Sequence, residues 1–291
     1  MQFRVLGNEG SWYCDDLARA AKASGHALER IDFRLLKTTI SSDAQRVQSA
    51  NAILNSCDAM IVRTMPPGSL EQVVYRMDAL HALERLGTRV VNSAKSIECA
   101  VDKYLTTSKL QLYKLPVPKT FVCESAEDAM EAFDQLGGDI LVKPLFGAEG
   151  RGIVRVSDLD LALRTFRTLE RIDCVLYLQE FINHGGFDIR VLVLNGDVIG
   201  SMLRRATDDF RTNVSRTGAA EKHQETQDEV SLALAAAKAT GAFFAGVDIL
   251  YDQTGAPFVI EVNAVPGWRA FNRVHNRDIA AEFIDVLGAT I

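Results

Sequence analysis

Two apolar segments near the C-terminus constrain the fold of this chain more than any other feature. Residues 245–251 (AGVDILY) and 257–263 (PFVIEVN) are joined by the turn sequence DQTG, which predicts two strands folded back beside each other. Asp248 lies in the first strand, and Glu261 and Asn263 lie two residues apart in the second, on one face. Each could be a surface residue at a strand end, but an unpaired carboxylate among apolar residues is costly to bury. We therefore expect the three to hold Mg²⁺ or Mn²⁺.

The order of the expected elements divides the chain into three parts. Strands alternate with helices over residues 1–95, which predicts a small parallel α/β domain. One of these helices should begin at Ser69, because Gln72 three residues later completes a capping-box pattern. The prolines of LPVP, at 115–118, impose an extended linker. Strands and helices alternate again up to about residue 182, and the rest is rich in strands. We expect a fold of mixed α/β and α+β class with domains at 1–95, 96–182 and 183–291, and a loop over the polar stretch 205–222.

A lysine and a glycine-rich loop follow one another in the middle part. Lys143 ends the apolar strand of LVKP, and FGAEGRG at 146–152 separates that strand from the next, which predicts a hairpin with a long tip. Glycines at 147, 150 and 152 let backbone N–H groups approach an anion closely. The loop lacks the G-K-[ST] signature of a Walker loop. A solvent-exposed lysine beside a flexible hairpin is the alternative interpretation of this segment.

Two further segments carry candidate binding residues. In LQEFI at 178–182, backbone groups near Glu180 and Ile182 could bind an adenine edge beside Phe181, although an amphipathic strand explains the pattern equally well. Asn195-Gly196 predicts a tight turn that pairs the strands on either side of it. That pairing would bring two guanidiniums near one place, where they could neutralise a phosphoryl group. The alternative is a surface ladder of charges; the polar residues concerned are Asp188, Arg190, Arg204, Arg205, Arg211 and Asn213.

The composition and charge of the chain argue against several other classes of protein. The net charge of -6 provides no general basic field for a nucleic acid. The five cysteines have no C-x-x-C spacing, which argues against a zinc or thioredoxin-like site and suits a reducing compartment. Neither a secretory signal nor an apolar run of membrane-spanning length is visible. We therefore expect a cytoplasmic protein without membrane or nucleic-acid partners.

Taken together and in order, these motifs resemble the ATP-grasp superfamily, and within it the RimK-like α-L-glutamate ligases. The resemblance covers residues 95–290, and the first 95 residues resemble the small domain that precedes the grasp in that family. Two segments also resemble a subset of RimK-like proteins linked to tetrahydromethanopterin or methanofuran one-carbon carriers: RTMPPGSLEQVVYRMDALHALE at 63–84 and AVDKYLTTSKL at 100–110. The motifs are Asp102-Lys103, LVKP, GAEGRG, LQEFI, DIR, RTNVSRTGA, GVDIL and IEVNAVPGW.

The resemblance implies a role for each matched residue. It implies a pre-ATP-grasp domain at 1–95, a lid lobe at 96–182 and a metal-binding lobe at 183–291. Asp248, Glu261 and Asn263 would bind Mg²⁺, and Arg190, Arg204 and Asn213 would face the acyl phosphate or the incoming amine. Nucleotide binding would fall to Lys103, Lys143, Gly147, Gly150, Gly152, Gln179, Glu180, Phe181, Ile182 and Asp188.

The implied reaction is ATP-dependent joining of a carboxylate to an amine. ATP would convert the carboxylate to an acyl phosphate, which the amine of L-glutamate would attack, with a small one-carbon carrier as the acceptor. A peptide, a protein C-terminus or an amino-group carrier is an alternative acceptor. A non-catalytic ATP-binding regulator is the alternative from another class. Relatives of this kind are often oligomeric, so a homo-oligomer is a further expectation.

Overall fold

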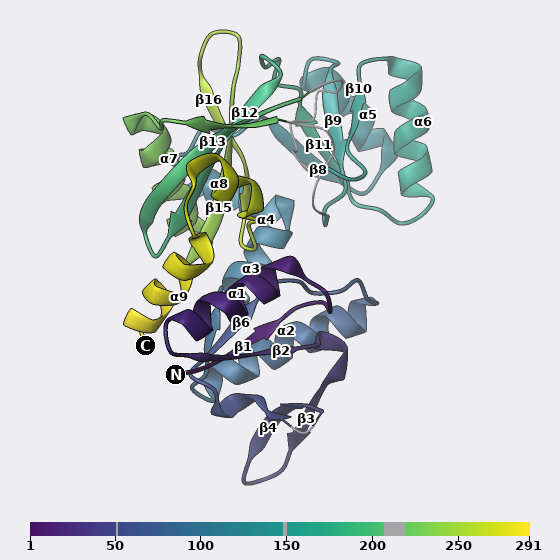
Figure 1. Ribbon diagram of the computed structural model, residues 1–291. Coiled ribbons are helices and arrows are strands. Elements are labelled where there is room, and N and C mark those ends of the chain that lie inside the picture. The colour runs from purple at the N-terminus through teal and green to yellow at the C-terminus, as the bar shows by residue number, and fades with distance from the viewer. Residues whose placement is uncertain (51, 148–149, 207–218) are drawn as a thin grey trace.

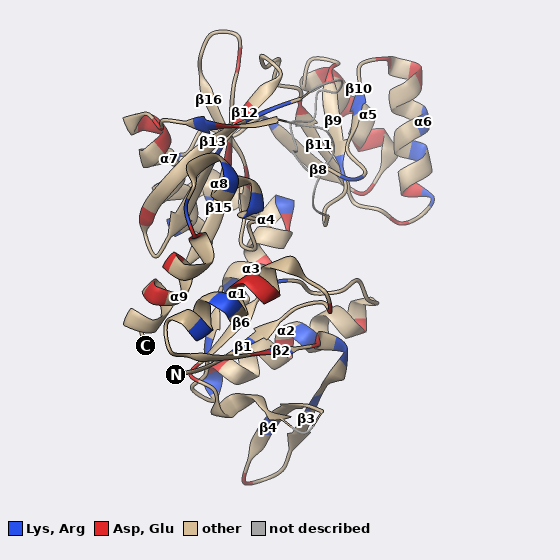
Figure 2. Ribbon diagram, viewed as in Figure 1, with Lys and Arg blue, Asp and Glu red and all other residues tan. Residues whose placement is uncertain are grey.

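The computed structural model describes residues 1–50, 52–147, 150–206 and 219–291. Its strands form three main sheets and one small one. The sheet of the N-terminal part lies at the bottom of Figure 1, and the other two main sheets lie at the top. No helix in the described part of the chain is long and apolar enough to cross a membrane. Charges of both signs are interspersed over these elements (Figure 2).

The N-terminal part is the parallel α/β unit that the sequence predicts. Its sheet has the order β2-β1-β6-β7, and every pairing in it is parallel. Helix α2 begins with the predicted capping box of Ser69 and Gln72. The main elements are β1 (Gln2–Leu6), α1 (Trp12–Ala23), β2 (Ala27–Ile31), β6 (Ala59–Val62), α2 (Leu70–Arg85), β7 (Arg89–Val91) and α3 (Ala94–Val101). Helix α4 (Lys103–Leu112) comes next along the chain and packs against the third sheet, described below.

A small antiparallel sheet in this part has no counterpart among the predicted elements. It consists of β3 (Leu36–Ile40), β4 (Gln45–Ser49) and β5 (Ala52–Ile53), flanked by the 3-10 turns η1 (Phe33–Leu35) and η2 (Leu54–Ser56). Only Leu36 of β3 is buried, and β4 buries two of its five residues. Its strands are short and largely polar, so the alternating pattern that identifies a half-buried strand is weak.

The second sheet is antiparallel and carries the predicted hairpin. Its order is β10-β9-β11-β8, and β9 (Ile140–Lys143) pairs with β10 (Val154–Val156) across the glycine-rich loop. Strands β8 (Thr120–Cys123) and β11 (Leu176–Glu180) complete it. Helices α5 (Ala126–Gln135) and α6 (Leu159–Glu170) cover this sheet and bury Phe133 and Phe166 against it.

The third sheet contains the two C-terminal strands that carry Asp248 and Glu261. Its order is β14-β13-β12-β15-β16, all antiparallel. Asn195 and Gly196 both have positive φ, 51° and 85°, as the predicted tight turn requires. The strands are β12 (Phe187–Leu194), β13 (Asp197–Arg205), β14 (Ala219–His223), β15 (Phe244–Tyr251) and β16 (Pro257–Asn263), and the helices are α7 (Gln227–Thr240), α8 (Arg269–His275) and α9 (Ile279–Ala289).

The predicted loop at 205–222 is wrong at both of its ends. Arg205 is the last residue of β13, and residues 219–222 belong to β14, which pairs with β13. Strand β14 is at the edge of the sheet and contains no fully buried residue, so it lacks the apolar alternation by which strands are recognised. Residues 207–218 lie outside the described residues.

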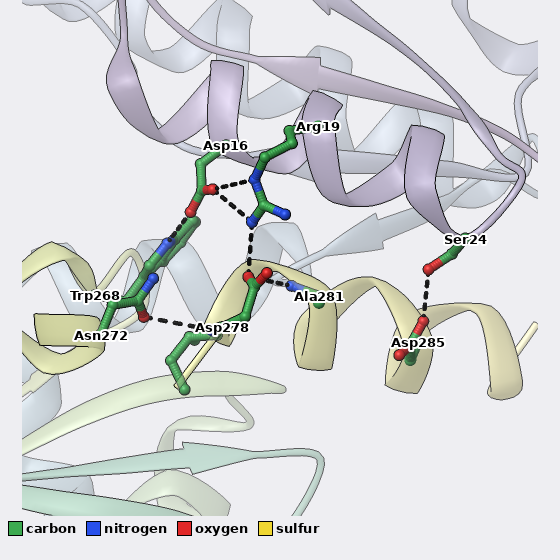
Figure 3. Close-up of polar contacts among 9 residues, drawn as sticks. Asp16, Arg19, Ser24, Trp268, Asn272, Asp278, Ala281 and Asp285 are labelled. Carbon is green, nitrogen blue, oxygen red and sulfur yellow. Dashed lines mark hydrogen bonds and ion pairs between the residues drawn. The ribbon is translucent and has the colours of Figure 1, made fainter. Parts of the chain in front are cut away.

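The N- and C-terminal parts share one core. Side chains of β1, α1 and β6 pack with side chains of α8, α9 and β15, and Trp268 is almost fully buried there. Figure 3 shows the polar contacts beside this core: Trp268 donates through Nε1 to Asp16, and Arg19 bonds both Asp16 and Asp278. Helix α9 therefore lies against α1, although the two are separated by most of the chain (Figure 1).

Asn92 connects the N-terminal sheet to the third sheet. Its Oδ1 accepts from the backbone N–H groups of Phe243 and Phe244, at 2.6 and 2.9 Å. Its Nδ2 donates to the carbonyls of Phe244 and Ala264, at 2.7 and 2.5 Å. The side chain is 2% exposed, so all four bonds are shielded from water.

Replacing Asn92 with alanine should therefore destabilise the whole protein. The substitution leaves buried backbone groups without partners, each costing about 1–3 kcal/mol, so we expect a total loss of about 2–4 kcal/mol. Urea denaturation measures it, with the exposed Asn8→Ala as the control. Equal unfolding midpoints for the two variants would contradict this role.

Candidate active site

The three predicted oxygen donors lie on the predicted pair of strands. Asp248 of β15 is directly opposite Glu261 of β16, and Gly246 is opposite Asn263. The register shifts between Asp248 and Ile249, which marks a β-bulge next to the carboxylate. Among the described residues, no group forms a hydrogen bond or ion pair with the carboxylate of Glu261. The amide nitrogen Nδ2 of Asn263, a donor, is buried without a partner.

Asp248 is held by both predicted arginines. Arg190 of β12 donates through Nε and a terminal nitrogen to its two oxygens, each at 2.6 Å, and Arg204 of β13 lies 2.9 Å from it. Arg204 also binds Asp188 through two nitrogens. The predicted convergence of the two guanidiniums is confirmed, and Asp248 lies at the point where they meet.

This arrangement shifts the pKa values of the two acids of the hairpin, Asp248 and Glu261, in opposite directions. Burial by itself would raise the pKa of Asp248, but the charges and hydrogen bonds of Arg190 and Arg204 hold that pKa below its usual range. Burial, together with the charge of Asp248, raises the pKa of Glu261, and the positive side chains around it offset this only in part. A bound cation would relieve the repulsion between the two carboxylates, which makes the donor set suitable for a divalent ion.

Two lysines approach the same carboxylates. Lys143 ends β9, is 9% exposed, and donates to Oε1 of Gln179 at 2.5 Å. Burial lowers the pKa of Lys143 to about 8. Lys103 is the first residue of α4 and donates to the carbonyl of Gly147 at 3.0 Å, and burial lowers its pKa as well. The charge of Glu261 acts against the lowering at both lysines.

These groups line one open cleft between the second and third sheets, with about 870 Å³ of empty space when the open solvent at its mouth is counted. Most predicted site residues line it: Lys103, Lys143, Gly147, Gly150, Gln179, Glu180, Phe181, Ile182, Asp188, Asp248 and Glu261. Four others, Gly152, Arg190, Arg204 and Asn263, are not among its described lining residues, and Asn213 lies outside the described residues.

The segment predicted to meet adenine forms one wall. Phe181 lines the cavity and has the guanidinium of Arg155 3.5 Å from its ring centroid. The backbone N–H of Glu180 already donates to Lys119, and its carboxylate accepts from the Lys119 N–H at 2.7 Å. These two hydrogen bonds of Glu180 therefore hold the end of β11 against Lys119.

Several lining residues were not singled out in the sequence, although a signal for some of them was present. Leu141 lies two residues before Lys143, and Leu250 two residues after Asp248, so strand periodicity places each on the face of its charged neighbour. Arg151 belongs to the glycine-rich loop that was singled out. His184 also lines the cavity, and its turn sequence gave no comparable signal.

Two protein-family models together match nearly the whole chain. Residues 100–287 match the RimK-like ATP-grasp domain, and residues 1–97 match the RimK PreATP-grasp domain. The chain is 33% identical to a tetrahydromethanopterin:alpha-L-glutamate ligase of Methanococcus maripaludis, over 98% of this chain and 97% of the relative. It is 31% identical to a ribosomal protein bS6–L-glutamate ligase of Escherichia coli, over 98% of this chain and 94% of the relative.

Solved structures agree on the fold. The ATP-grasp ligase PsnB, complexed with a minimal precursor, superimposes with a TM-score of 0.77 at 20% identity, over 99% of both chains. A RimK domain ATP-grasp protein from Sphaerobacter thermophilus gives a TM-score of 0.74 at 21% identity, again over 99% of both. The predicted ATP-grasp fold with its preceding α/β domain is confirmed, and the chain belongs to the RimK-like family of ATP-grasp proteins as an ATP-dependent ligase.

Proposed function

We propose that this ligase activates a carboxylate of a small acceptor with ATP and joins it to the amine of L-glutamate. The observation that carries the proposal is the composition of one cavity. Buried Lys143 and half-buried Lys103 line it together with the carboxylates of Asp248 and Glu261. Such a cavity offers cations to phosphate oxygens and acidic ligands to a divalent ion, which are the two requirements of phosphoryl transfer from ATP.

In the proposed reaction the lysines hold the ATP phosphates, and the wall of Phe181 and Ile182 contacts the adenine. Asp188, whose carboxylate Arg204 already binds, lines the cavity where a ribose would lie. Glu261, Asp248 and Asn263 would hold Mg²⁺, and Mn²⁺ suits the same donors. The carboxylate of Glu261, which faces Asp248 across the strand pair, fits that role. The ligand atom of Asn263 would be its Oδ1, because its Nδ2 is a donor. When bound, the ion would neutralise charge on the phosphates.

The two arginines, Arg190 and Arg204, have different proposed roles. Arg204 is 3% exposed and holds both Asp188 and Asp248, so it would orient these acids without meeting the substrate. The side chain of Arg190 is 15% exposed. It would therefore be the cation that faces the acyl phosphate or the incoming amine. The corresponding role of Asn213 stays a prediction from the sequence.

The acceptor is proposed from the relatives. Tetrahydromethanopterin:alpha-L-glutamate ligases of two archaea match this chain at 33% and 35% identity, so a pterin-linked one-carbon carrier is the first candidate. The ribosomal protein ligase at 31% identity makes a protein C-terminus the second. L-glutamate is named as the amine by both kinds of relative.

The direct test incubates the enzyme with ATP, Mg²⁺ and L-glutamate and with each acceptor in turn. We expect a mass gain of one or more glutamyl units on a pterin- or furan-type carrier, with ADP and phosphate released in equal amounts. A bS6-type C-terminal peptide serves as the competing acceptor. ATP hydrolysis without any glutamylated product would contradict the proposed function.

Glu261→Gln should abolish activity without weakening the fold. Loss of the unpaired ligand should lower kcat at least about a hundredfold. Because burial raises the pKa of Glu261, its charge opposes folding at pH 7, so the neutral variant should melt no lower than wild type. Melting curves should show that Mg²⁺ with ADP stabilises wild type but not the variant. The exposed Glu127→Gln is the control, and a variant with wild-type kcat or the same stabilisation by Mg²⁺ and ADP would contradict a metal-binding role.

Lys143 should make ATP binding depend on pH. Its pKa of about 8 means that it carries its charge at pH 7 and loses it as the pH rises. If the neutral form does not bind the phosphates, KM for ATP should rise about tenfold between pH 7 and pH 9. Lys143→Arg, whose guanidinium does not titrate in this range, should show a flatter profile. Parallel profiles for the two enzymes would contradict the assignment.

A further inference from the structure

Tyr177 carries a buried hydroxyl, close to the cleft between the second and third sheets, that the proposed reaction does not use. It lies in β11, is 1% exposed, and is directly opposite Lys143 of β9 in the antiparallel pair. Gln179 follows two residues later on the same strand, so the two side chains lie on one face of the sheet. Leu178, between them, packs on the other face, in the core under α5 and α6. The strand pairing therefore places this phenol beside a lysine that lines the cleft.

Gln179 connects the phenol to Lys143. Its Oε1 accepts from Nζ of Lys143 at 2.5 Å, and its Nε2 donates to the hydroxyl of Tyr177 at 3.3 Å and to Oγ1 of Thr120 at 3.0 Å. A lysine ammonium can only donate, so the amide oxygen has to face it and the amide nitrogen has to face the two hydroxyls. The side chain of Gln179 is 2% exposed, and both hydrogens of its amide are in use. Its orientation is therefore fixed.

The hydroxyl of Tyr177 is bonded in turn to Oγ1 of Thr107 in α4, at 2.8 Å. Because this hydroxyl accepts from Gln179, its own hydrogen is available to Thr107. Thr107 lies four residues after Lys103, so the two side chains are neighbours on one face of the helix. The series of hydrogen bonds therefore runs from one lysine of the cleft to the helix that begins with the other.

This series also joins two parts of the fold. Helix α4 packs against α7 and β16 and buries Leu110 in the core of the third sheet, whereas Tyr177 belongs to the second sheet. The bonds of Lys103 lead only as far as the segment that follows β9. The bond between Thr107 and Tyr177 reaches β11, which is paired on both sides within the second sheet. It therefore ties α4 to the interior of that sheet.

The ammonium of Lys143 requires a support of this kind. A lysine side chain is long and flexible, and its charge is costly to bury without polar partners. In the described part of the chain, no carboxylate forms an ion pair with Lys143, in contrast to Arg190 and Arg204, which are held by aspartates. The neutral oxygen of Gln179 holds the ammonium without neutralising it, so its charge and its other N–H donors stay available to phosphate oxygens.

We propose that Tyr177 and Thr107 are positioning residues for the proposed reaction. Through Gln179, their hydroxyls hold the ammonium of Lys143 where the phosphates of ATP bind, in a fixed relation to Lys103. The inference rests on the proposed function, which assigns both lysines to the phosphates. Neither Tyr177 nor Thr107 lines the part of the cleft that the structure describes, so both act through Gln179 and not by touching the nucleotide.

The test is a double-mutant cycle of Tyr177→Phe and Thr107→Val, each of which removes one hydroxyl and nearly keeps the size of the side chain. The matched control is Tyr251→Phe, which removes a hydroxyl bonded to the buried carboxylate of Glu229 at 2.8 Å. Tyr251 follows Leu250, which lines the cleft, so its own side chain lies on the other face of β15. Calorimetric titration with ADP and Mg²⁺ measures nucleotide binding without turnover. Values of kcat, of KM for ATP and L-glutamate, and of Tm complete the measurements.

We expect each single variant to raise Kd for ADP and KM for ATP about three- to tenfold and to leave KM for L-glutamate within about twofold. The double variant should be little worse than either single variant, because both substitutions remove the same bond. Thr107→Ser keeps the hydroxyl and should stay close to wild type. Tyr251→Phe should lower Tm and leave the binding and kinetic constants unchanged.

Constants for ADP and ATP equal to those of Tyr251→Phe would overturn the positioning role even if Tm falls, because the hydroxyls would then serve the fold alone. Equal increases in KM for ATP and for L-glutamate would overturn it as well, and fully multiplicative effects in the double variant would contradict the shared bond.

Two precautions keep these outcomes decisive. If Tyr177→Phe does not fold, Thr107→Val is compared with Thr107→Ser, and equal Kd values for ADP in these two would overturn the proposal. Wild-type enzyme that binds ADP but forms no glutamylated product contradicts the proposed function by itself. The positioning role is then judged on the titration with ADP, which requires no product.

Discussion

The ion-paired group at Asp248 is the interaction on which the rest of the site depends. Asp248 is almost completely buried in the third sheet. Arg190 binds it from the neighbouring strand β12, and Arg204 binds it from β13, the strand beyond. Removing one partner of such a pair typically costs about 3–5 kcal/mol, because the other charge is left buried and uncompensated. The group therefore fixes β12, β13 and β15 relative to one another before any ligand is bound.

The charge of Asp248 also affects its neighbour Glu261, whose pKa it raises. Glu261 lies opposite Asp248 and has no protein partner among the described residues, so its charge is opposed both by burial and by the nearby carboxylate. A site that keeps one acid satisfied and one acid free is prepared for a cation. Lys103 and Lys143 complete the cavity with positive charge for phosphates. Asp248 thus contributes to the stability of the sheet as well as to the proposed metal site, whereas Glu261 contributes to the metal site alone.

The sequence predicted the elements that have strong local signals. The strands around Asp248 and Glu261, the capping box at Ser69 and the turn at Asn195 follow from apolar runs, caps and turn residues. Exposed edge strands such as β14 lack the apolar alternation and were predicted as loop. The register that places Asp248 between two arginines depends on pairing across three strands, which periodicity along one strand does not specify.

The burial of Arg63 was equally hidden in the sequence. It follows an ordinary apolar strand, and an arginine in that place is expected to reach solvent. Only the packing of Tyr13 and Trp268 around it, which joins residues about 250 positions apart, shows that it is buried. This burial comes from the contact between the N-terminal sheet and the segment after β16.

The central claim is that the cavity between the second and third sheets activates a carboxylate as an acyl phosphate. The most direct test uses an acceptor whose carboxylate carries ¹⁸O in both oxygens, with ATP, Mg²⁺ and L-glutamate, followed by mass spectrometry of the released phosphate. Transfer of the γ-phosphoryl group to the carboxylate and attack by the amine leave one acceptor oxygen on the phosphate. Phosphate with one ¹⁸O for each amide formed is the predicted result, and unlabelled phosphate accompanying amide formation would contradict the account.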